Sequence, residues 1–239
     1  MAQGLINVDD ICKSFLVTKM YGEPGVWPYE TIAACKIICT NADDETEEFH
    51  RIFTSNEEHA EANLVEYLRN NAKVKMSRRI IIKIYMNYSP CSDCAKIILE
   101  YIKGIEWQNM EIIMTITFAN FYKTHVYPGN DIDIARANIE GLKKLYIEHG
   151  VKFRLLGVHV KWERFLDMSE FFNLTEVEKD DCLDEACSDK RQRREVQDQM
   201  VWGEIFNDWV GVITSGLNSD LLEEIREAMD ELSLTTDLR

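Results

Sequence analysis

The sequence predicts an α/β fold in which a five-stranded mixed sheet is flanked by about six or seven helices and its last two strands run parallel. Two short β-type runs around an acidic turn indicate a hairpin. Segments with strand and helix periodicity then alternate along the chain. A helical segment long enough for a crossover separates the last two strands, which favours a parallel pair over a second hairpin.

The expected elements follow one another without an internal repeat. An amphipathic helix opens the chain, with apolar residues at helical spacing: Leu5, Val8, Ile11, Cys12, Phe15 and Leu16. Strands are expected over residues 31–40, 49–54, 79–88, 110–119 and 151–160. Helices are expected over residues 59–71, 94–105 and 131–150, the last of them stopped at Gly150.

The chain is divided into a core domain over residues 1–175 and a helical C-terminal extension over residues 176–239, packed on the core or extending from it. The segment 179–195 has no apolar stripe and is interpreted as a linker or an exposed helix. Its basic run KRQRR, residues 190–194, is interpreted as a solvated charge run, with nuclear import or nucleic-acid contact as alternatives.

Charge and cysteine content limit the possible functions. The 239-residue chain carries a formal net charge of −15, which disfavours generic binding of polyanions. Basic side chains nevertheless gather in residues 73–83 and 190–194, so local basic patches stay possible. Seven cysteines, without a signal-like or membrane-length apolar run, predict a cytoplasmic or nuclear protein that is neither secreted nor bound to a membrane. Closely spaced cysteines in such a protein indicate a metal site or catalysis before disulfides.

The stretch NYSPCSDC, residues 87–94, places two cysteines at the expected start of a helix. Pro90 suits the first helical position and Ser89 a capping position, so Cys91 and Cys94 fall in the opening turns. Free N–H groups and the helix dipole stabilise thiolates there. With His59, which opens the preceding helix, they make three zinc ligands and leave the fourth position open, as in catalytic zinc sites.

Glu61 is the predicted proton carrier of this site. In mid-helix the side chains of His59 and Glu61 would diverge by about 200°, so they converge only at a helix end, and the helix is expected to start near Glu58. A capping box beginning at Ser55 is the alternative, and it would place His59 in the second turn. Each motif is weak alone, but H-x-E together with P-C-x-x-C is the established signature of zinc-dependent nucleobase deaminases.

Four segments then carry a family resemblance: HAE (59–61), SPCSDC (89–94), TFANFY (117–122) and YET (29–31). Over about residues 5–175 the sequence resembles the AID/APOBEC family of polynucleotide cytidine deaminases. The crossover helix separates it from free-nucleoside deaminases, which join their last two strands as a hairpin, but not from tRNA adenosine deaminases. Two positions depart from the family pattern: Tyr88 stands where the family usually has Trp, and Asn120 where it often has Arg.

The resemblance implies hydrolytic deamination of cytosine to uracil in single-stranded nucleic acid, DNA before RNA, with Zn²⁺ activating water and Glu61 moving protons. It implies that Tyr122 packs against the target cytosine, that Thr31 lines the pocket, and that loop aromatics including Phe121 stack the strand. The expected substrate-contacting residues are Trp27, Thr31, Asn56, Tyr88, Ser89, Asn120 and Tyr122.

Several alternatives stay open. Tyr122 can be a core aromatic, and Asn56 can cap a helix instead of contacting substrate. The tail 221–238 either packs on the domain or resembles the leucine-rich export tail of AID-like proteins. Cys182 and Cys187 allow a second metal site but lack nearby histidines. The same fold can act on a free nucleotide or on tRNA adenosine, or can bind RNA or a protein partner without turnover.

Overall fold

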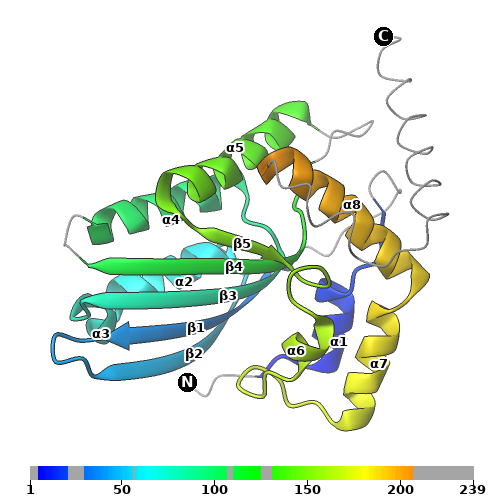
Figure 1. Ribbon diagram of the computed structural model, residues 1–239, viewed down its shortest axis with the longest axis horizontal. Coiled ribbons are helices and arrows are strands. Elements are labelled where there is room, and N and C mark those ends of the chain that lie inside the picture. The colour runs from blue at the N-terminus through cyan, green and yellow to red at the C-terminus, as the bar shows by residue number, and fades with distance from the viewer. Residues whose placement is uncertain (1–4, 21–29, 56, 107–109, 125–130, 207–239) are drawn as a thin grey trace.

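A single mixed sheet of five strands organises the computed structural model (Figure 1). The structure describes residues 5–20, 30–55, 57–106, 110–124 and 131–206. The strand order is β2-β1-β3-β4-β5. The strands are β1 (Ile32–Thr40), β2 (Thr46–Thr54), β3 (Arg79–Tyr88), β4 (Glu111–Asn120) and β5 (Lys152–Leu155). β1 is antiparallel to β2 and β3, whereas β4 is parallel to both β3 and β5, which confirms the predicted fold class and the parallel last pair.

Helical segments flank this sheet, and several are short. They are α1 (Val8–Asp10) with the π-helical turn η1 (Ile11–Phe15), α2 (Ala60–Asn70), α3 (Ala72–Lys75), α4 (Ser92–Glu106), α5 (Ile132–His149), α6 (Trp162–Leu166), α7 (Glu176–Ala186) and α8 (Asp189–Phe206). The described residues thus contain a few more helical segments than expected, because short turns such as α1, α3 and α6 give little periodicity in the sequence. In the same residues no helix has the length and apolarity needed to cross a bilayer.

Successive side chains along the strands face opposite sides of the sheet, so the interior has two hydrophobic cores. Cys35 and Ile37 of β1 face a core built with α2, α4, α5 and the C-terminal half of α8. Ile32 and Ala34 face the opposite side, where the N-terminal segment, α6 and α7 cover the sheet. Figure 1 shows α4 and α5 along one face, α8 near the ends of β4 and β5, and α7 next to α1 and α6. The metal-binding candidates lie at the α2 and α4 edge of the first core.

The last strand is much shorter than the predicted 151–160. β5 ends at Leu155, because the chain turns back through Gly157, whose φ of 81° is left-handed and favours glycine. In this turn the Gly157 N–H donates to the Val160 carbonyl over 2.8 Å, and the Leu155 N–H donates to His159 Nδ1 over 3.0 Å. The apolar residues after 155 therefore pack in a turn and do not extend the sheet.

The segment 179–195 is neither a linker nor an exposed helix, so that prediction is wrong. It forms the end of α7 and the start of α8, and its Cys182, Arg191 and Arg194 are fully buried. No apolar stripe marks it, because much of its buried face consists of arginines and a cysteine. The division into residues 1–175 and 176–239 stays a prediction, and the tail 221–238 lies outside the described residues.

Candidate metal centre

Three side chains from two helix starts converge at one point. The His59 Nδ1 atom lies 3.1 Å from Cys94 Sγ and 3.5 Å from Cys91 Sγ. All three potential ligand atoms lie within 4.8 Å of one another. The cluster is graded in exposure, since His59 is exposed, Cys91 is intermediate and Cys94 is buried. A small molecule can therefore approach from the His59 side.

The local backbone explains this convergence. His59 is the N-cap of α2, with the extended angles φ −67° and ψ 147°, so its ring leaves the helix axis and reaches α4. Helix α2 begins at Ala60, close to the expected start, and the alternative capping box does not form. Ser55 instead accepts a hydrogen bond from the Thr31 N–H over 2.7 Å. The first turn of α2 therefore carries His59 and Glu61 toward the same place.

The start of α4 differs from the prediction. The helix begins at Ser92, and the Cys91 carbonyl accepts its first helical bond from the Ala95 N–H over 2.8 Å. Pro90 lies before the helix, and Ser89 does not cap it. The buried Ser89 hydroxyl accepts from the Tyr122 N–H over 3.0 Å. Cys91 and Cys94 still occupy the opening turn, where the helix dipole favours anionic sulfur.

The donor set fits zinc. Zinc takes nitrogen at about 2.0 Å and sulfur at about 2.3 Å, so tetrahedral ligands of these two kinds lie about 3.5 Å apart. The observed separations of 3.1 and 3.5 Å are close to this value. A hydrogen bond with Cys94 lowers the pKa of Cys91 to about 5, while the same bond and burial raise the pKa of Cys94. The lowered pKa favours a thiolate at Cys91, which is the form in which cysteine binds a metal.

Glu61 is buried beside these ligands, with 3% of its surface exposed. Burial raises the pKa of its carboxyl group to about 7, which suits proton exchange near neutral pH. Its Oε2 atom is buried and has no hydrogen-bond partner among the described residues. An unpartnered buried carboxylate oxygen next to three ligand atoms is the arrangement expected where a water or a substrate group binds.

An open hollow of about 430 Å³ adjoins the ligands. The residues that line it include His59, Cys91, Tyr122, Lys123 and Ile134. The aromatic recognition residue expected from the sequence therefore lies beside the metal ligands. The Tyr88 and Tyr122 rings meet edge to face with their centroids 5.8 Å apart, which ties the Tyr122 ring to the end of β3.

The remaining predicted contact residues fall into three groups. Thr31 is half-buried, and its carbonyl accepts from the Ser55 N–H over 2.9 Å, which ties it to the loop leading to His59. Asn120 is fully buried and bonded within the protein, so its side chain has the position of a scaffold residue. Trp27 and Asn56 lie outside the described residues. The assignment of substrate contacts to all of these residues stays a prediction.

Sequence reasoning missed Asn138, which connects the two halves of the site. From α5, its Oδ1 atom accepts from the Ser92 N–H over 2.8 Å, between the two cysteines. Its Nδ2 atom donates to the carbonyls of Tyr122 and Lys123 over 3.1 and 3.3 Å. Asn138 stands four residues before Leu142, at helical spacing with an apolar residue, and a polar residue at such a position was the available signal, because buried polar groups need partners.

Lys123 was also missed. Its backbone has a φ of 46°, in the left-handed region that non-glycine residues rarely occupy and that often marks functional segments. Its ammonium group lies 5.2 Å from the centroid of the Tyr122 ring. A cationic group therefore borders the hollow, although the exposed carboxylates of Asp93 and Asp133 line it as well.

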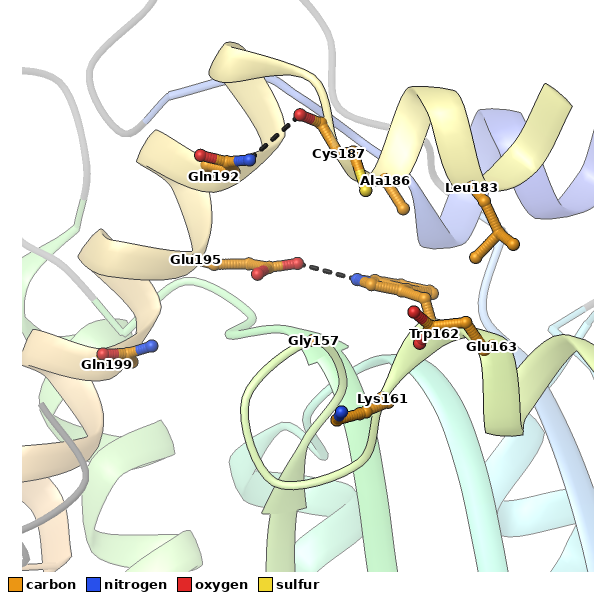
Figure 2. A pocket seen from close by; sticks show the side chains of 10 residues that line it. All are labelled: Gly157, Lys161, Trp162, Glu163, Leu183, Ala186, Cys187, Gln192, Glu195 and Gln199. Atoms are coloured by element: carbon orange, nitrogen blue, oxygen red, sulfur yellow. Dashed lines mark hydrogen bonds between the residues drawn. The ribbon is translucent and has the colours of Figure 1, made fainter. Parts of the chain in front are cut away.

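Several side chains of the two basic runs are paired or buried. Within 73–83, Lys73 pairs with Glu47, Arg78 with Asp44, and Arg79 with Glu111. In KRQRR, Arg191 and Arg194 are completely buried, so the interpretation of a fully solvated run is wrong. A second hollow, of about 340 Å³, lies between the turn at Gly157, α7 and α8 (Figure 2), and none of the predicted site residues lines it.

Fold and site together define a cytidine-deaminase-like domain: a mixed sheet with a parallel last pair, and a His-Cys-Cys cluster at two helix starts. A family model described as APOBEC1 matches residues 45–156, which include all four proposed zinc and acid–base residues. The resemblance to the AID/APOBEC family stated above is thus confirmed over this region. A search of curated proteins finds no match.

Proposed function

We propose that this protein is a zinc-dependent hydrolase that converts cytosine to uracil in single-stranded polynucleotide, DNA before RNA. One observation carries the proposal. A buried carboxylate, Glu61, with an unpartnered oxygen, adjoins a His-Cys-Cys set whose spacing fits zinc, inside the region that matches the APOBEC1 family. Zinc at these ligands would act as a Lewis acid and lower the pKa of a water at the open position.

The residues of the chain would divide the work as follows. Glu61 accepts a proton from the attacking water and donates it to the ring nitrogen of the base, and it then transfers the second proton, from the hydroxyl now on C4, to the leaving amino group. The raised pKa of Glu61, about 7, supports transfer in both directions. Tyr122, held edge to face by Tyr88, stacks the target base, and Thr31 borders it from the start of β1. Ammonia leaves and uracil remains.

Access to the site and the cation at its rim support a polymeric, single-stranded substrate. A base stacked in a duplex cannot reach a pocket bounded by helix starts, so it must be unpaired. Lys123 at the rim supports contact with one phosphate. The net charge of −15 and the paired basic residues support weak binding with a shallow dependence on salt. A cytoplasmic or nuclear location is proposed with this function, on the cysteine content alone.

The test is uracil formation in a cytosine-bearing single-stranded oligonucleotide, with Glu61→Gln as the comparison. We expect product from the wild type, loss of product from the variant, and one zinc per chain in both. Turnover of free cytidine or of tRNA adenosine in place of the oligonucleotide would favour the alternative substrates. Full zinc content without turnover of any of these would favour a silent binding protein.

A further inference from the structure

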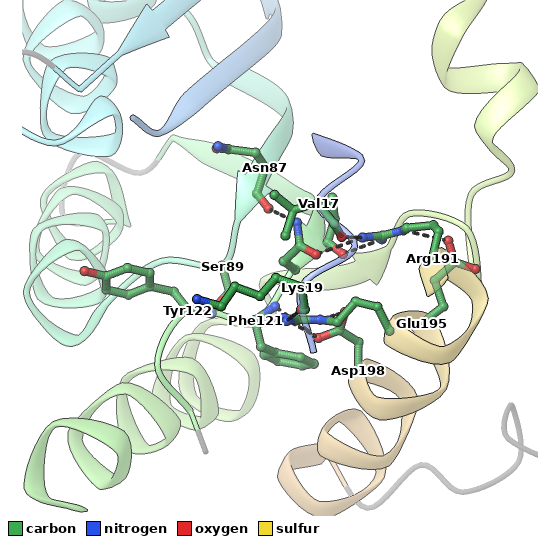
Figure 3. A network of polar contacts seen from close by, with 12 residues as sticks. Val17, Lys19, Asn87, Ser89, Phe121, Tyr122, Arg191, Glu195 and Asp198 are labelled. Carbon is green, nitrogen blue, oxygen red and sulfur yellow. Dashed lines mark hydrogen bonds and ion pairs between the residues drawn. The ribbon is translucent and has the colours of Figure 1, made fainter. Parts of the chain in front are cut away.

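Two completely buried arginines on α8 lie next to the segment that leads to Tyr122 (Figure 3). Arg191 and Arg194 have no exposed surface, which is rare for arginine and requires that the guanidinium groups be paired and hydrogen-bonded. Neither residue lines the hollow at the metal centre. Their contacts therefore indicate a function that is exerted through other residues.

Arg191 donates hydrogen bonds to the end of β4. Its Nη1 donates to Asn120 Oδ1 over 2.9 Å and to the Val17 carbonyl over 3.0 Å, and its Nη2 donates to the Ala119 carbonyl over 2.9 Å. Its Nε donates to Glu195 Oε1 over 3.1 Å. Four acceptors in the fixed plane of one guanidinium define its position, which a lysine ammonium cannot reproduce.

Glu195, one turn further along α8, holds the Arg191 guanidinium in place. Its Oε1 atom also accepts from the Trp162 indole over 2.8 Å, as Figure 2 shows, and the guanidinium lies 5.1 Å from the Trp162 ring centroid. Gly157 packs directly against this carboxylate, and a Cβ at that position would overlap it. The turn that shortens β5 therefore also fixes the support of Arg191.

Arg194 and Asp198 form a second pair on α8 that contacts the same segment. The guanidinium donates to both oxygens of Asp198 over 3.0 and 3.2 Å, and also to the Lys19 carbonyl over 2.9 Å. Asp198 Oδ1 in turn accepts from the Phe121 N–H over 3.3 Å. A paired Arg–Asp unit on α8 thus holds the backbone of the residue that precedes Tyr122.

Arg191 with Glu195 and Arg194 with Asp198 form the α8 anchor, and further hydrogen bonds connect it to the metal centre. The Asn120 carbonyl accepts from the Ser89 N–H over 2.9 Å, and the Ser89 hydroxyl accepts from the Tyr122 N–H. Phe121 turns toward α8, where it packs on Trp202 at 6.5 Å between centroids, whereas Tyr122 projects away from α8 (Figure 3). Each residue from Ala119 to Tyr122 is therefore held at its backbone or side chain, three of the four by contacts with α8.

We propose that Arg191 and the Arg194–Asp198 pair are positioning residues that hold the segment 119–122 so that Tyr122 faces the metal centre. A pair of buried charges contributes little net stability but fixes one geometry, because any other arrangement leaves a charge unpaired. The proposal rests on the proposed function in so far as Tyr122 binds the target base. The placement of Tyr122 itself is tested without turnover.

The experiment compares Arg191→Lys and Asp198→Asn with the wild type in the full chain. Both variants keep side chains of similar size and weaken the anchors, and Arg164→Lys, at an exposed arginine of α6, is the matched control. We expect KM for the oligonucleotide to rise about tenfold in each, as charged hydrogen bonds are lost, with kcat within about twofold and zinc content unchanged. The control should match the wild type.

Amide hydrogen exchange provides the readout that does not depend on activity. Exchange at the Phe121 and Tyr122 amides should accelerate about tenfold, whereas the Ala95 amide in the metal-ligand turn should keep its wild-type rate. Equal exchange in variants and wild type would overturn the proposal. Equal acceleration at Ala95 and Phe121 would also overturn it, because the arginines would then support only overall stability.

Two further results separate this proposal from the function above. If the wild type turns over no substrate, the proposed function fails, while the exchange data still decide the positioning. If Arg191→Lys does not fold, Gly157→Ala displaces Glu195 and loosens the same guanidinium from a distance. Faster exchange confined to Phe121 and Tyr122 in that variant supports the positioning, and unchanged exchange refutes it.

Discussion

The metal centre and the anchor on α8 are both buried clusters of ionisable side chains, but they differ in how completely they are satisfied. Arg191 and Arg194 donate to acceptors on every side. At the metal centre, Glu61 keeps a buried oxygen without a partner among the described residues. A closed network fixes geometry, whereas an incomplete one next to ligand atoms marks a place where a further species binds.

The two clusters also differ in what they hold together. The metal centre joins the starts of α2 and α4, with ligands supplied by two short motifs. The α8 anchor joins segments that are remote in the sequence, since Arg191 bonds to Val17, 174 residues away, and to Ala119, 72 residues away. Damage to the first cluster should therefore abolish chemistry, whereas damage near the segment 119–122 should change binding and stability.

The largest effect is expected at the ligands themselves. Cys94→Ser should lower zinc affinity by more than about 100-fold and remove turnover, because one of three protein ligands is lost. Zinc titration monitored by a competing chelator gives the affinity. Cys187→Ser, at an exposed cysteine outside the cluster, is the control and should bind zinc like the wild type. Equal zinc affinity in the two variants would break the assignment of the site.

The next largest effect is expected at Asn138, whose side chain contacts both the turn that carries the cysteine ligands and the segment that contains Tyr122. Asn138→Ala leaves the Ser92 N–H and the Tyr122 and Lys123 carbonyls without their partner and should reduce the free energy of unfolding by about 1–3 kcal/mol. Chemical denaturation measures this loss. Zinc affinity should fall and the KM for the oligonucleotide should rise, because the residue links the turn that carries the cysteine ligands to the segment 119–122.

Glu140→Ala, at an exposed residue of the same helix, should change the free energy of unfolding by less than about 0.5 kcal/mol. A change of similar size in both variants would mean that Asn138 contributes only helix stability.

A pair of glycine substitutions sharpens the packing beneath the metal centre. A Cβ at Gly141 would come within 2.9 Å of the Ala95 Cβ and 3.3 Å of the Ser92 Cα, so Gly141→Ala should force α5 away from the ligand turn and destabilise by about 1–2 kcal/mol. A Cβ at Gly104 would meet no atom within 4 Å beyond its chain neighbours and its own helix backbone, and Gly104→Ala should stabilise α4 by up to about 1 kcal/mol. Thermal unfolding of the two variants checks the opposite signs, and the same sign in both would contradict the close approach of α5.

The smallest effect is expected at Lys123. Lys123→Gln should raise KM a few-fold and make the salt dependence of binding shallower by about 0.7 in the log–log slope, the value for one phosphate on a single strand. Binding of a fluorescent oligonucleotide at several salt concentrations measures the slope. Lys144→Gln, on the exposed side of α5, should leave it unchanged. An unchanged slope in Lys123→Gln would place the phosphates elsewhere.

The metal centre was accessible to sequence reasoning because its information is local. Pro90, Cys91 and Cys94 fall within five residues, and a helix start has a physical reason to hold thiolates. The Ile-rich run at 79–88 likewise coincides with β3, because β-branched side chains favour a buried central strand.

Other features depend on partners that the sequence does not reveal. KRQRR has the composition of a solvated run, and its burial is favourable because of acceptors far away in the sequence, among them the carbonyls of Ala119, Val17 and Lys19. On α5 the apolar Ile134 is 43% exposed, whereas the polar Asn138 is 1% exposed. The helix turns its small and polar side toward α4, because Gly141 allows the close approach and Asn138 satisfies the Ser92 N–H there.

The central claim is that Glu61 and the three ligands form a working deaminase centre. It is tested most directly by counting uracils formed per zinc-loaded chain on one single-stranded oligonucleotide, with wild type and Glu61→Gln in parallel. The account predicts multiple turnovers by the wild type and a rate lower by about 10²–10⁴-fold in the variant at equal zinc content. Equal rates in the two proteins, or a fully zinc-loaded wild type that forms no uracil, would contradict it.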